Sequence, residues 1–349
     1  MAQLLPVDEF DLIIFGGTGD LAMRKLLPAL YHRDLDKQFT GASRIIAVGR
    51  SKLSQNKYLE KVESALRANL GDGEFDAAFW KSFAARVEYH QVDVSSPANW
   101  NLLVKTLDGQ EERIRVAYLA TAPSLFGPIA KGLKKNGLIT ANSRIVLEKP
   151  LGRDLESASK INDQVGKCFR ENQIYRIDHY LGKETVQNLL ALRFGNSLFE
   201  PLWNRGTIDH VQITVAEDLG TGGRAEFFDH TGTLRDMVQN HMLQLLCLVA
   251  MEAPASMHHE DIRSEKIKVL RCLRRITPET VERVTVRGQY RSGAIGDITT
   301  VTVDFYVGAH FGGFRAEMDH VLLLDMAIHS FDEARFLSGT DPVAVTAVD

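Results

Sequence analysis

Apolar runs and amphipathic segments alternate through the first half of the chain. The runs that predict buried strands lie at residues 10–15, 44–49, 87–92, 114–120 and 143–147. Segments with helical periodicity lie between them, at about 19–33, 56–71, 97–108 and 125–136. Because strands and helices alternate regularly, we expect an α/β, Rossmann-like, doubly wound domain with a parallel sheet.

The second half has a different pattern. We predict a helix at about 183–195, an alternating strand at 208–215, a glycine-rich loop at 220–223 and a long helix at about 233–251. A chain of 349 residues is longer than one core usually supports, so two domains are expected. We place a dinucleotide-binding domain at 1–176 and an α+β domain for substrate binding and catalysis at 177–349.

Composition narrows the classes of function. The formal net charge of −4 gives no basic field that would attract nucleic acid or an anionic membrane. The three cysteines lie far apart without a CxxC pair, which argues against a disulfide framework or a metal site. The first residues include Asp8 and Asp11 and no long apolar run, so no signal peptide is expected. No apolar stretch is long enough to span a bilayer. We therefore expect a cytoplasmic protein that binds neither nucleic acid nor membranes.

A glycine-rich turn, Gly16-Gly17-Thr18-Gly19-Asp20, joins the first predicted strand to the first predicted helix. Small residues here let the backbone approach a pyrophosphate, and the start of the helix adds N–H donors and partial positive charge. The spacing differs from GxGxxG, so a plain loop is the alternative. Its place after the first strand of an alternating domain favours dinucleotide binding.

The end of the second predicted strand distinguishes between cofactors. An acidic residue there would bind the ribose 2′-hydroxyl of NAD, but Arg50 and Ser51 follow the strand in this sequence. Arg50 can pair with a 2′-phosphate, which favours NADP. The alternative is a solvated arginine at a strand end.

The tripeptide Glu148-Lys149-Pro150 follows the strand at 143–147. Carboxyl ends of strands in an open sheet face the ligand crevice, so Lys149 is placed to meet a substrate hydroxyl or the nicotinamide region. Pro150 is a candidate for a cis peptide bond. A surface Glu–Lys pair is the alternative.

The run from Arg176 to Glu184 is dense in chemistry, with a carboxylate, an imidazole, a phenol and an ammonium. His179 and Lys183 are four residues apart, so on a helix they would share a face and could clamp one phosphate. Metal ligation is the other interpretation of His179, but no second His or Cys stands at ligand spacing.

His241 lies in the long predicted helix beside Asp236, Gln239 and Asn240, which suit the lining of a site better than a helix core. Oxidation of an alcohol by hydride transfer needs a general base, and histidine suits that task near neutral pH. A nearby carboxylate would fix its tautomer. A structural histidine is the alternative.

Residues from about 8 to 293 resemble the glucose-6-phosphate dehydrogenase family. The matching stretches are Phe15-Gly16-Gly17-Thr18-Gly19-Asp20-Leu21-Ala22 with Lys25, Glu148-Lys149-Pro150-Leu151-Gly152, Arg176 to Glu184, Thr214-Val215-Ala216-Glu217 and Arg235 to His241. The run Asp178-His179-Tyr180-Leu181-Gly182-Lys183 is highly specific to that family. The resemblance implies NADP-dependent oxidation of glucose 6-phosphate at C1 to 6-phosphogluconolactone, which opens the pentose phosphate pathway.

The resemblance also implies a role for each matching residue. It implies that His241 is the base on the C1 hydroxyl and that Asp178 orients it. It assigns the 6-phosphate to His179, Tyr180 and Lys183, and the sugar hydroxyls to Lys149, Glu217 and Asp236. It assigns NADP to Gly16, Gly17, Gly19, Asp20, Leu21, Arg50 and Lys149.

After about residue 293 the resemblance changes. The tail, about 297–349, resembles the Gfo/Idh/MocA oxidoreductases, which also combine a Rossmann domain with a Glu-Lys-Pro motif. In that family an Asp-x-x-x-His pair, here Asp325 and His329, sits at the catalytic centre. The alternative is a packed helix in which His329 merely lies beside apolar residues.

The family's large antiparallel sheet carries an Arg-Thr-Gly-Lys segment that binds the sugar phosphate, and no such segment occurs in this sequence. We therefore expect a truncated or chimeric second domain, and a homo-oligomer whose family-type dimer interface is incomplete. Two other functions stay open: a sugar or polyol dehydrogenase of the Gfo/Idh/MocA type, and a non-catalytic NADP-binding remnant.

Overall fold

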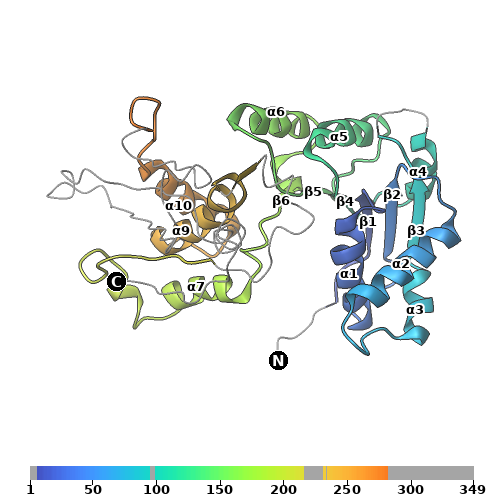
Figure 1. The fold of residues 1–349 in the computed structure, drawn as a ribbon, viewed down its shortest axis with the longest axis horizontal. Helices are drawn as coiled ribbons and strands as arrows, with labels where there is room; N and C mark the ends of the chain where they lie inside the picture. The colour runs from blue at the N-terminus through green and yellow to red at the C-terminus, as the bar shows by residue number, and fades with distance from the viewer. Residues whose placement is uncertain (1–5, 95–98, 216–230, 233, 282–349) are drawn as a thin grey trace, which may run out of the picture. The chain divides into compact units, whose positions relative to one another are not determined.

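The structure is a computed structural model, which describes residues 6–94, 99–215, 231–232 and 234–281. The chain divides into two compact units, Met1–Ile177 and Asp178–Asp349 (Figure 1).

Unit 1 is built on a six-stranded parallel sheet with the strand order β3-β2-β1-β4-β5-β6 (Figure 1). The strands are β1 (Phe10–Phe15), β2 (Arg44–Gly49), β3 (Val87–Gln91), β4 (Ile114–Leu119), β5 (Ser143–Leu147) and β6 (Ile174–Arg176). The chain adds β2 and β3 on one side of β1 and then returns to place β4 on the other side. The strand order therefore reverses between β1 and β4, and folds of this kind bind ligands at the carboxyl edge of that reversal.

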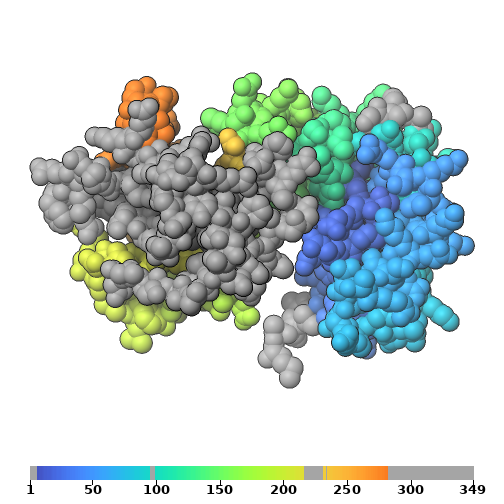
Figure 2. Space-filling view, viewed as in Figure 1, coloured from blue at the N-terminus to red at the C-terminus, as the bar shows by residue number. Residues whose placement is uncertain are grey.

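Both faces of the sheet are buried, which is why its strands read as continuous apolar runs. In β1, Ile13 and Phe15 point into one core while Ile14 points into the other. The first core is completed by α4 (Trp100–Leu107), α5 (Phe126–Lys135) and α6 (Leu155–Gly166). The second is completed by α1 (Leu27–Leu35), α2 (Gln55–Asn69) and α3 (Ala77–Ala84). Figure 2 shows the surface of this unit in space-filling form, coloured from blue to green by residue number.

The predicted doubly wound fold is confirmed, with strand bounds that differ by no more than a residue at the predicted runs. Two α-helices and one strand of the unit were not predicted. Helices α3 and α6 are preceded by the N-cap residues Asp76 and Asp154, whose carboxylates accept N–H bonds from the first turn. Strand β6 has three residues, and a run that short has no period to detect.

The helix predicted at 19–33 has an irregular start. Residues Ala22–Leu26 form a π-helical segment, labelled η1, and α1 follows at Leu27. Pro28 lies in the first turn of α1 and has no N–H to donate to the carbonyl four residues earlier. A change of helical register just before a proline accommodates this missing donor.

The described part of unit 2 is helical. Its long helices are α7 (Glu184–Phe194), the π-helical segment η7 (Leu234–Met242), which runs directly into α9 (Leu243–Ala250), and α10 (His259–Cys272). A core of Tyr180, Val186, Met237, Val238, Met242, Leu245 and neighbouring residues joins them. No described helix of either unit is long and apolar enough to cross a membrane.

The strand predicted at 208–215 is not observed. These residues belong to no strand and to no strand pair of the described chain. Alternation of apolar and polar residues specifies which face would be buried, but a segment becomes a strand only when another strand pairs with its backbone. Among the described residues, no strand pairs with the backbone of residues 208–215.

Candidate active site

The glycine turn lies at the carboxyl edge of unit 1, where the strand order reverses. Gly16 has φ +86°, and a Cβ atom on it would lie 2.3 Å from the Ala120 carbonyl oxygen at the end of β4. A Cβ atom on Gly17 would lie 2.7 Å from Cβ of Ala47 in β2. The N–H groups of both glycines donate to the Val48 carbonyl at 2.9 Å. Only glycine lets the turn sit this close to both neighbouring strands.

The surroundings of this turn fit a dinucleotide. The Thr121 hydroxyl oxygen, just beyond β4, is buried and has no hydrogen-bond partner within the described chain, so the site holds an unused polar group. Gly19 donates to the Gly16 carbonyl at 2.9 Å, which completes the turn, and the helical segment begins beyond it. The structure thus brings the predicted cofactor residues Gly16, Gly17, Gly19, Asp20 and Leu21 together at one place. Asp20 itself forms an ion pair with Arg24 at 3.1 Å.

Arg50 follows β2 at the same edge of the sheet. A Cβ atom on its neighbour Gly49 would lie 3.2 Å from the Thr18 hydroxyl, so the end of β2 adjoins the glycine turn. The Arg50 side chain is exposed and forms no ion pair with a described residue. A guanidinium at this position is available to a phosphate group on an adenosine ribose.

Lys149 follows β5, also at the carboxyl edge. The Lys149–Pro150 peptide bond is cis, as the sequence predicted. Sequence reasoning missed the neighbouring contact, in which the Tyr118 hydroxyl donates a short hydrogen bond to Oε1 of Glu148. Burial, together with this bond and the charge of Glu148, raises the pKa of Tyr118, so the phenol stays protonated and holds the turn. Tyr118 lies near the carboxyl end of β4, the strand beside β5, and this position in the sequence could have indicated the contact with Glu148.

The central geometry of unit 2 is a contact between His241 on η7 and Asp178 in the turn before α7. His241 Nδ1 lies 2.7 Å from Asp178 Oδ1, and the imidazole is 1% exposed. Asp178 Oδ1 also accepts the Tyr180 backbone N–H at 2.9 Å. Burial alone would raise the pKa of Asp178, but the bond and charge of His241, the Tyr180 N–H and His179 together bring that pKa below its ordinary value. The carboxylate is therefore ionised and can orient the imidazole.

The remaining residues of the Asp178–Lys183 run gather around this pair. The Tyr180 ring stacks on the His241 ring with centroids 4.3 Å apart, and the His179 ring centroid is 5.3 Å from it. The Lys183 ammonium lies 3.7 Å from the centroid of the Tyr180 ring on which it rests. The residues predicted to bind the phosphate and the predicted base, His241, therefore lie in one cluster.

One expectation about this run is wrong. His179 and Lys183 do not share a helix face, because residues 179–182 form turns and α7 starts at Glu184. The Asp178 carboxylate bonds the backbone two residues on, which favours a turn over a helix. Lys183 is brought to the cluster through the Tyr180 ring instead.

The other predicted residues divide into two groups. Asp236 is 7% exposed and lies about one turn before His241 on η7. Glu217, Asp325 and His329 lie outside the described residues, as do the predicted glycine-rich loop and the tail. Among the residues that are described, no group of three or more His, Cys, Asp or Glu side chains could hold a metal ion.

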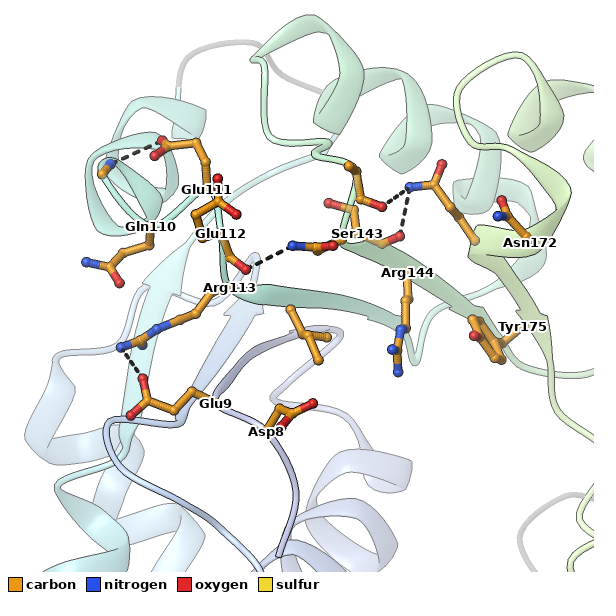
Figure 3. A pocket seen from close by; sticks show the side chains of 15 residues that line it. Asp8, Glu9, Gln110, Glu111, Glu112, Arg113, Ser143, Arg144, Asn172 and Tyr175 are labelled. Atoms are coloured by element: carbon orange, nitrogen blue, oxygen red, sulfur yellow. Dashed lines mark hydrogen bonds and ion pairs between the residues drawn. The ribbon is translucent and has the colours of Figure 1, made fainter.

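Unit 1 also has a cavity of about 860 Å³, which does not lie at the carboxyl edge of the sheet. It lies at the opposite, amino-terminal edge of the sheet, lined by Glu9, Arg113, Ser143 and Arg144 among others (Figure 3). Arg113 pairs there with Glu9 at 3.2 Å. Ligands of open α/β sheets bind at the carboxyl edge, so we assign this cavity no part in the site.

The fold and the glycine turn define the class: a protein with a Rossmann-like NAD(P)-binding domain. A family model described as "Glucose-6-phosphate dehydrogenase, NAD binding domain" matches residues 13–188, and one described as "Glucose-6-phosphate dehydrogenase, C-terminal domain" matches residues 190–307. The chain belongs to the glucose-6-phosphate dehydrogenase family. A third model, "GFO/IDH/MocA C-terminal domain", matches residues 284–348 and confirms the resemblance of the tail.

Individual proteins of this family are similar to the chain over most of its length. The chain is 57% identical over 293 residues to the glucose-6-phosphate 1-dehydrogenase of Rhizobium meliloti, covering 84% of this chain and 60% of the relative. It is 52% identical over 296 residues to that of Mycolicibacterium smegmatis, with the same coverage. The chain thus spans about 60% of the length of these relatives.

Solved structures show the same likeness. The crystal structure of glucose-6-phosphate 1-dehydrogenase from Mycobacterium avium matches with a TM-score of 0.72 and 37% identity, covering 78% of this chain and 58% of that one. A glucose-6-phosphate dehydrogenase in complex with its substrate glucose-6-phosphate matches with a TM-score of 0.70 and 38% identity, covering 78% and 57%.

Proposed function

We propose that this protein oxidises glucose 6-phosphate at C1 to 6-phosphogluconolactone with NADP as the hydride acceptor, at the start of the pentose phosphate pathway. The observation that carries the proposal is the buried hydrogen bond between His241 and Asp178 beside Tyr180 and Lys183. Family membership and the substrate named for the solved relative support the same reaction.

His241 takes the proton of the C1 hydroxyl. Nδ1 bonds Asp178, and we assign the proton transfer to Nε2. Asp178 holds this tautomer and stabilises the imidazolium that forms. Bound NADP supplies the nicotinamide that accepts the hydride from C1.

The 6-phosphate is assigned to Lys183 with His179 and Tyr180. Lys183 supplies a positive charge, and His179 and Tyr180 supply ring N–H and hydroxyl donors on the same cluster. The sugar hydroxyls are assigned to Lys149, Glu217 and Asp236, on the strength of the family motifs in which they stand.

NADP is assigned to the glycine turn, with Asp20 and Leu21 beginning the helix behind it, and to Lys149. Arg50 is assigned to the 2′-phosphate, because it is an exposed cation at the end of β2 beside the turn. We place cofactor binding in residues 1–176 and substrate binding and proton transfer in residues 177–349. We further propose a cytoplasmic location and a homo-oligomer with an incomplete family-type dimer interface.

Steady-state formation of NADPH from NADP and glucose 6-phosphate tests this function. We expect saturable turnover that His241→Asn lowers by a factor on the order of 10³. His259→Asn is the matched control, because this histidine is exposed on α10 and pairs with Glu260 at the surface. Folded wild-type protein that binds NADP in calorimetry but turns over no sugar phosphate would instead indicate a non-catalytic NADP-binding module.

A second candidate function rests on the match of residues 284–348 to the Gfo/Idh/MocA C-terminal domain. In that case the chain is an NAD(P)-dependent sugar or polyol dehydrogenase that uses His329 as its base, together with Asp325 and Lys149. The two candidates differ in a direct comparison. If the second function is correct, His329→Ala abolishes turnover and His241→Ala does not. If the first function is correct, His241→Ala abolishes turnover and His329→Ala does not.

A further inference from the structure

Two tyrosines of unit 1 connect the glycine turn to the segment that follows β2. Tyr58, on α2, donates from its hydroxyl to the Gly17 carbonyl at 2.8 Å. Tyr89, on β3, donates from its hydroxyl to the Ser51 carbonyl at 2.6 Å. The two rings stack, with centroids 4.6 Å apart and planes inclined by 21°. Two hydrogen bonds and one ring stack therefore link the two places to which we assign different parts of NADP.

The tyrosine pair, Tyr58 and Tyr89, is buried and held from both sides. Tyr58 is 0% exposed and Tyr89 is 8% exposed. The side-chain amide of Gln55, the first residue of α2, donates to the Val87 carbonyl at 2.7 Å and accepts the Tyr89 N–H at 2.9 Å. Because β3 is the edge strand of the sheet, Gln55 makes the bonds that a further strand would make. Helix α2 therefore carries one tyrosine and holds the strand that carries the other.

Both phenols act as hydrogen-bond donors. Burial raises the pKa of Tyr58 and of Tyr89, and for Tyr58 the neighbouring Tyr89 adds to the effect, so both stay protonated at neutral pH. The end of β2 leaves room for the pair. A Cβ atom on Gly49 would lie 3.1 Å from the Tyr89 hydroxyl oxygen and 3.2 Å from Oγ1 of Thr18. The Tyr89 hydroxyl and the glycine turn thus both lie against the last residue of β2.

We propose that the tyrosine pair positions Arg50 relative to the glycine turn and so sets the preference for NADP over NAD. The turn is assigned to the part that both cofactors share, and Arg50 to the 2′-phosphate that only NADP carries. Because Arg50 directly precedes Ser51, a bond to the Ser51 carbonyl restrains the backbone that carries the guanidinium. A restrained backbone has less freedom to lose when the phosphate binds. The proposal rests on the proposed cofactor, and both tyrosines are positioning residues without an assigned contact to it.

Phenylalanine variants isolate each hydroxyl. Tyr89→Phe and Tyr58→Phe remove one hydrogen bond each and keep the buried rings and their stack. Other bonds hold the same two segments, from the Gln91 amide to the Arg50 carbonyl at 3.2 Å and from the Lys61 ammonium to the Thr18 carbonyl at 3.0 Å. We therefore expect the loss of one hydroxyl to loosen a segment without displacing it, and its effect on binding to be moderate.

The first measurement is calorimetric binding of NADP and of NAD, without turnover. Tyr89→Phe should weaken NADP about threefold to tenfold and leave NAD unchanged. Tyr58→Phe loosens the turn that both cofactors use, so it should weaken both by a similar factor and keep their ratio. Tyr31→Phe is the matched control, because Tyr31 is 0% exposed in the same core but bonds Asp76 before α3, and it should change neither affinity. A wild-type ratio of NADP to NAD affinity in Tyr89→Phe would overturn the proposal.

The second measurement is a double-mutant cycle with Arg50→Ala. Tyr89→Phe should have no further effect on NADP binding once the guanidinium is gone, whereas a loss of stability alone would weaken binding equally in both backgrounds and contradict the proposal. A ratio that changes in Arg50→Ala but not in Tyr89→Phe overturns the positioning role alone. A ratio unchanged in Arg50→Ala overturns the cofactor assignment as well. If Tyr89→Phe does not fold, Gln91→Leu releases the same segment at the Arg50 carbonyl, and an unchanged ratio in it would count against the proposal.

Discussion

His241 Nδ1 and Asp178 Oδ1 lie 2.7 Å apart although the two residues are 63 positions apart in the chain. One stands on a helix and the other in a turn, and both are largely shielded from solvent. A hydrogen bond at this distance, between a buried imidazole and an ionised carboxylate, fixes the orientation of the ring. Unit 2 therefore holds the His241 imidazole in one defined orientation.

Replacing Asp178 by asparagine tests the value of that orientation. The amide keeps the shape of the carboxylate but cannot stabilise an imidazolium, so kcat should fall by a factor on the order of 10² to 10³. KM for glucose 6-phosphate should change little. Asp209→Asn is the control, because Asp209 also bonds a histidine, His210 at 3.1 Å, but at the surface. Equal losses in both variants would contradict an orienting role for Asp178.

The same carboxylate predicts a pH-dependent contribution to stability. The pKa of Asp178 is lowered in the folded protein, so the unfolded chain takes up the proton first as pH falls. The stability that Asp178 contributes is therefore complete above its ordinary pKa of about 3.9 and is lost as pH falls through the folded value. Urea unfolding at pH 6 and at steps below about pH 4 measures this. The difference in unfolding free energy between wild type and Asp178→Asn should shrink over that acidic range. A difference that stays constant there would show that the carboxylate is not preferentially ionised in the folded state.

The sequence predicted the architecture of unit 1 well because its strands are buried on both faces. A continuous apolar run such as Ile13-Ile14-Phe15 is typical of a strand that is covered on both faces, and these residues lie in the two cores of unit 1. Helix α10 was missed because most of its residues are polar and none is fully buried. The bond from Lys266 on α10 to Gln244 on α9 could therefore not be found from the sequence, since nothing placed the two helices side by side.

The candidate site depended on another kind of information. Periodicity identified His241 as a helical residue with polar neighbours, but it cannot pair residues across 63 positions. Resemblance to a family supplied that pair, and the contact then appeared in the structure. The shared helix face considered for His179 and Lys183 does not form, because spacing alone does not weigh the local bond from the Tyr180 N–H to Asp178.

Arg50 predicts the choice of cofactor. Arg50→Ala removes the cation that we assign to the 2′-phosphate, so binding of NADP should weaken about tenfold to a hundredfold while binding of NAD is unchanged. Calorimetry of the two cofactors with wild type and variant gives the ratio directly, without turnover. Lys52→Ala removes another exposed cation two residues away and should leave the ratio as it is. Equal weakening for both cofactors would remove Arg50 from the 2′-phosphate.

Replacing Gly16 by alanine tests whether the close packing of the glycine turn against β4 is needed for stability and for NADP binding. An alanine there meets two obstacles, a φ of +86° and a Cβ only 2.3 Å from the Ala120 carbonyl oxygen, which belongs to the backbone and cannot rotate away. Gly137 has a φ of +68° and nothing within 4 Å of an added Cβ, so Gly137→Ala measures the backbone strain alone. We expect Gly137→Ala to cost about 1 kcal/mol of unfolding free energy and Gly16→Ala about 2 kcal/mol more, with loss of NADP binding. Chemical denaturation and calorimetry give both quantities. If the two variants were equally stable and both bound NADP, the close packing of the turn against β4 would play no part in cofactor binding.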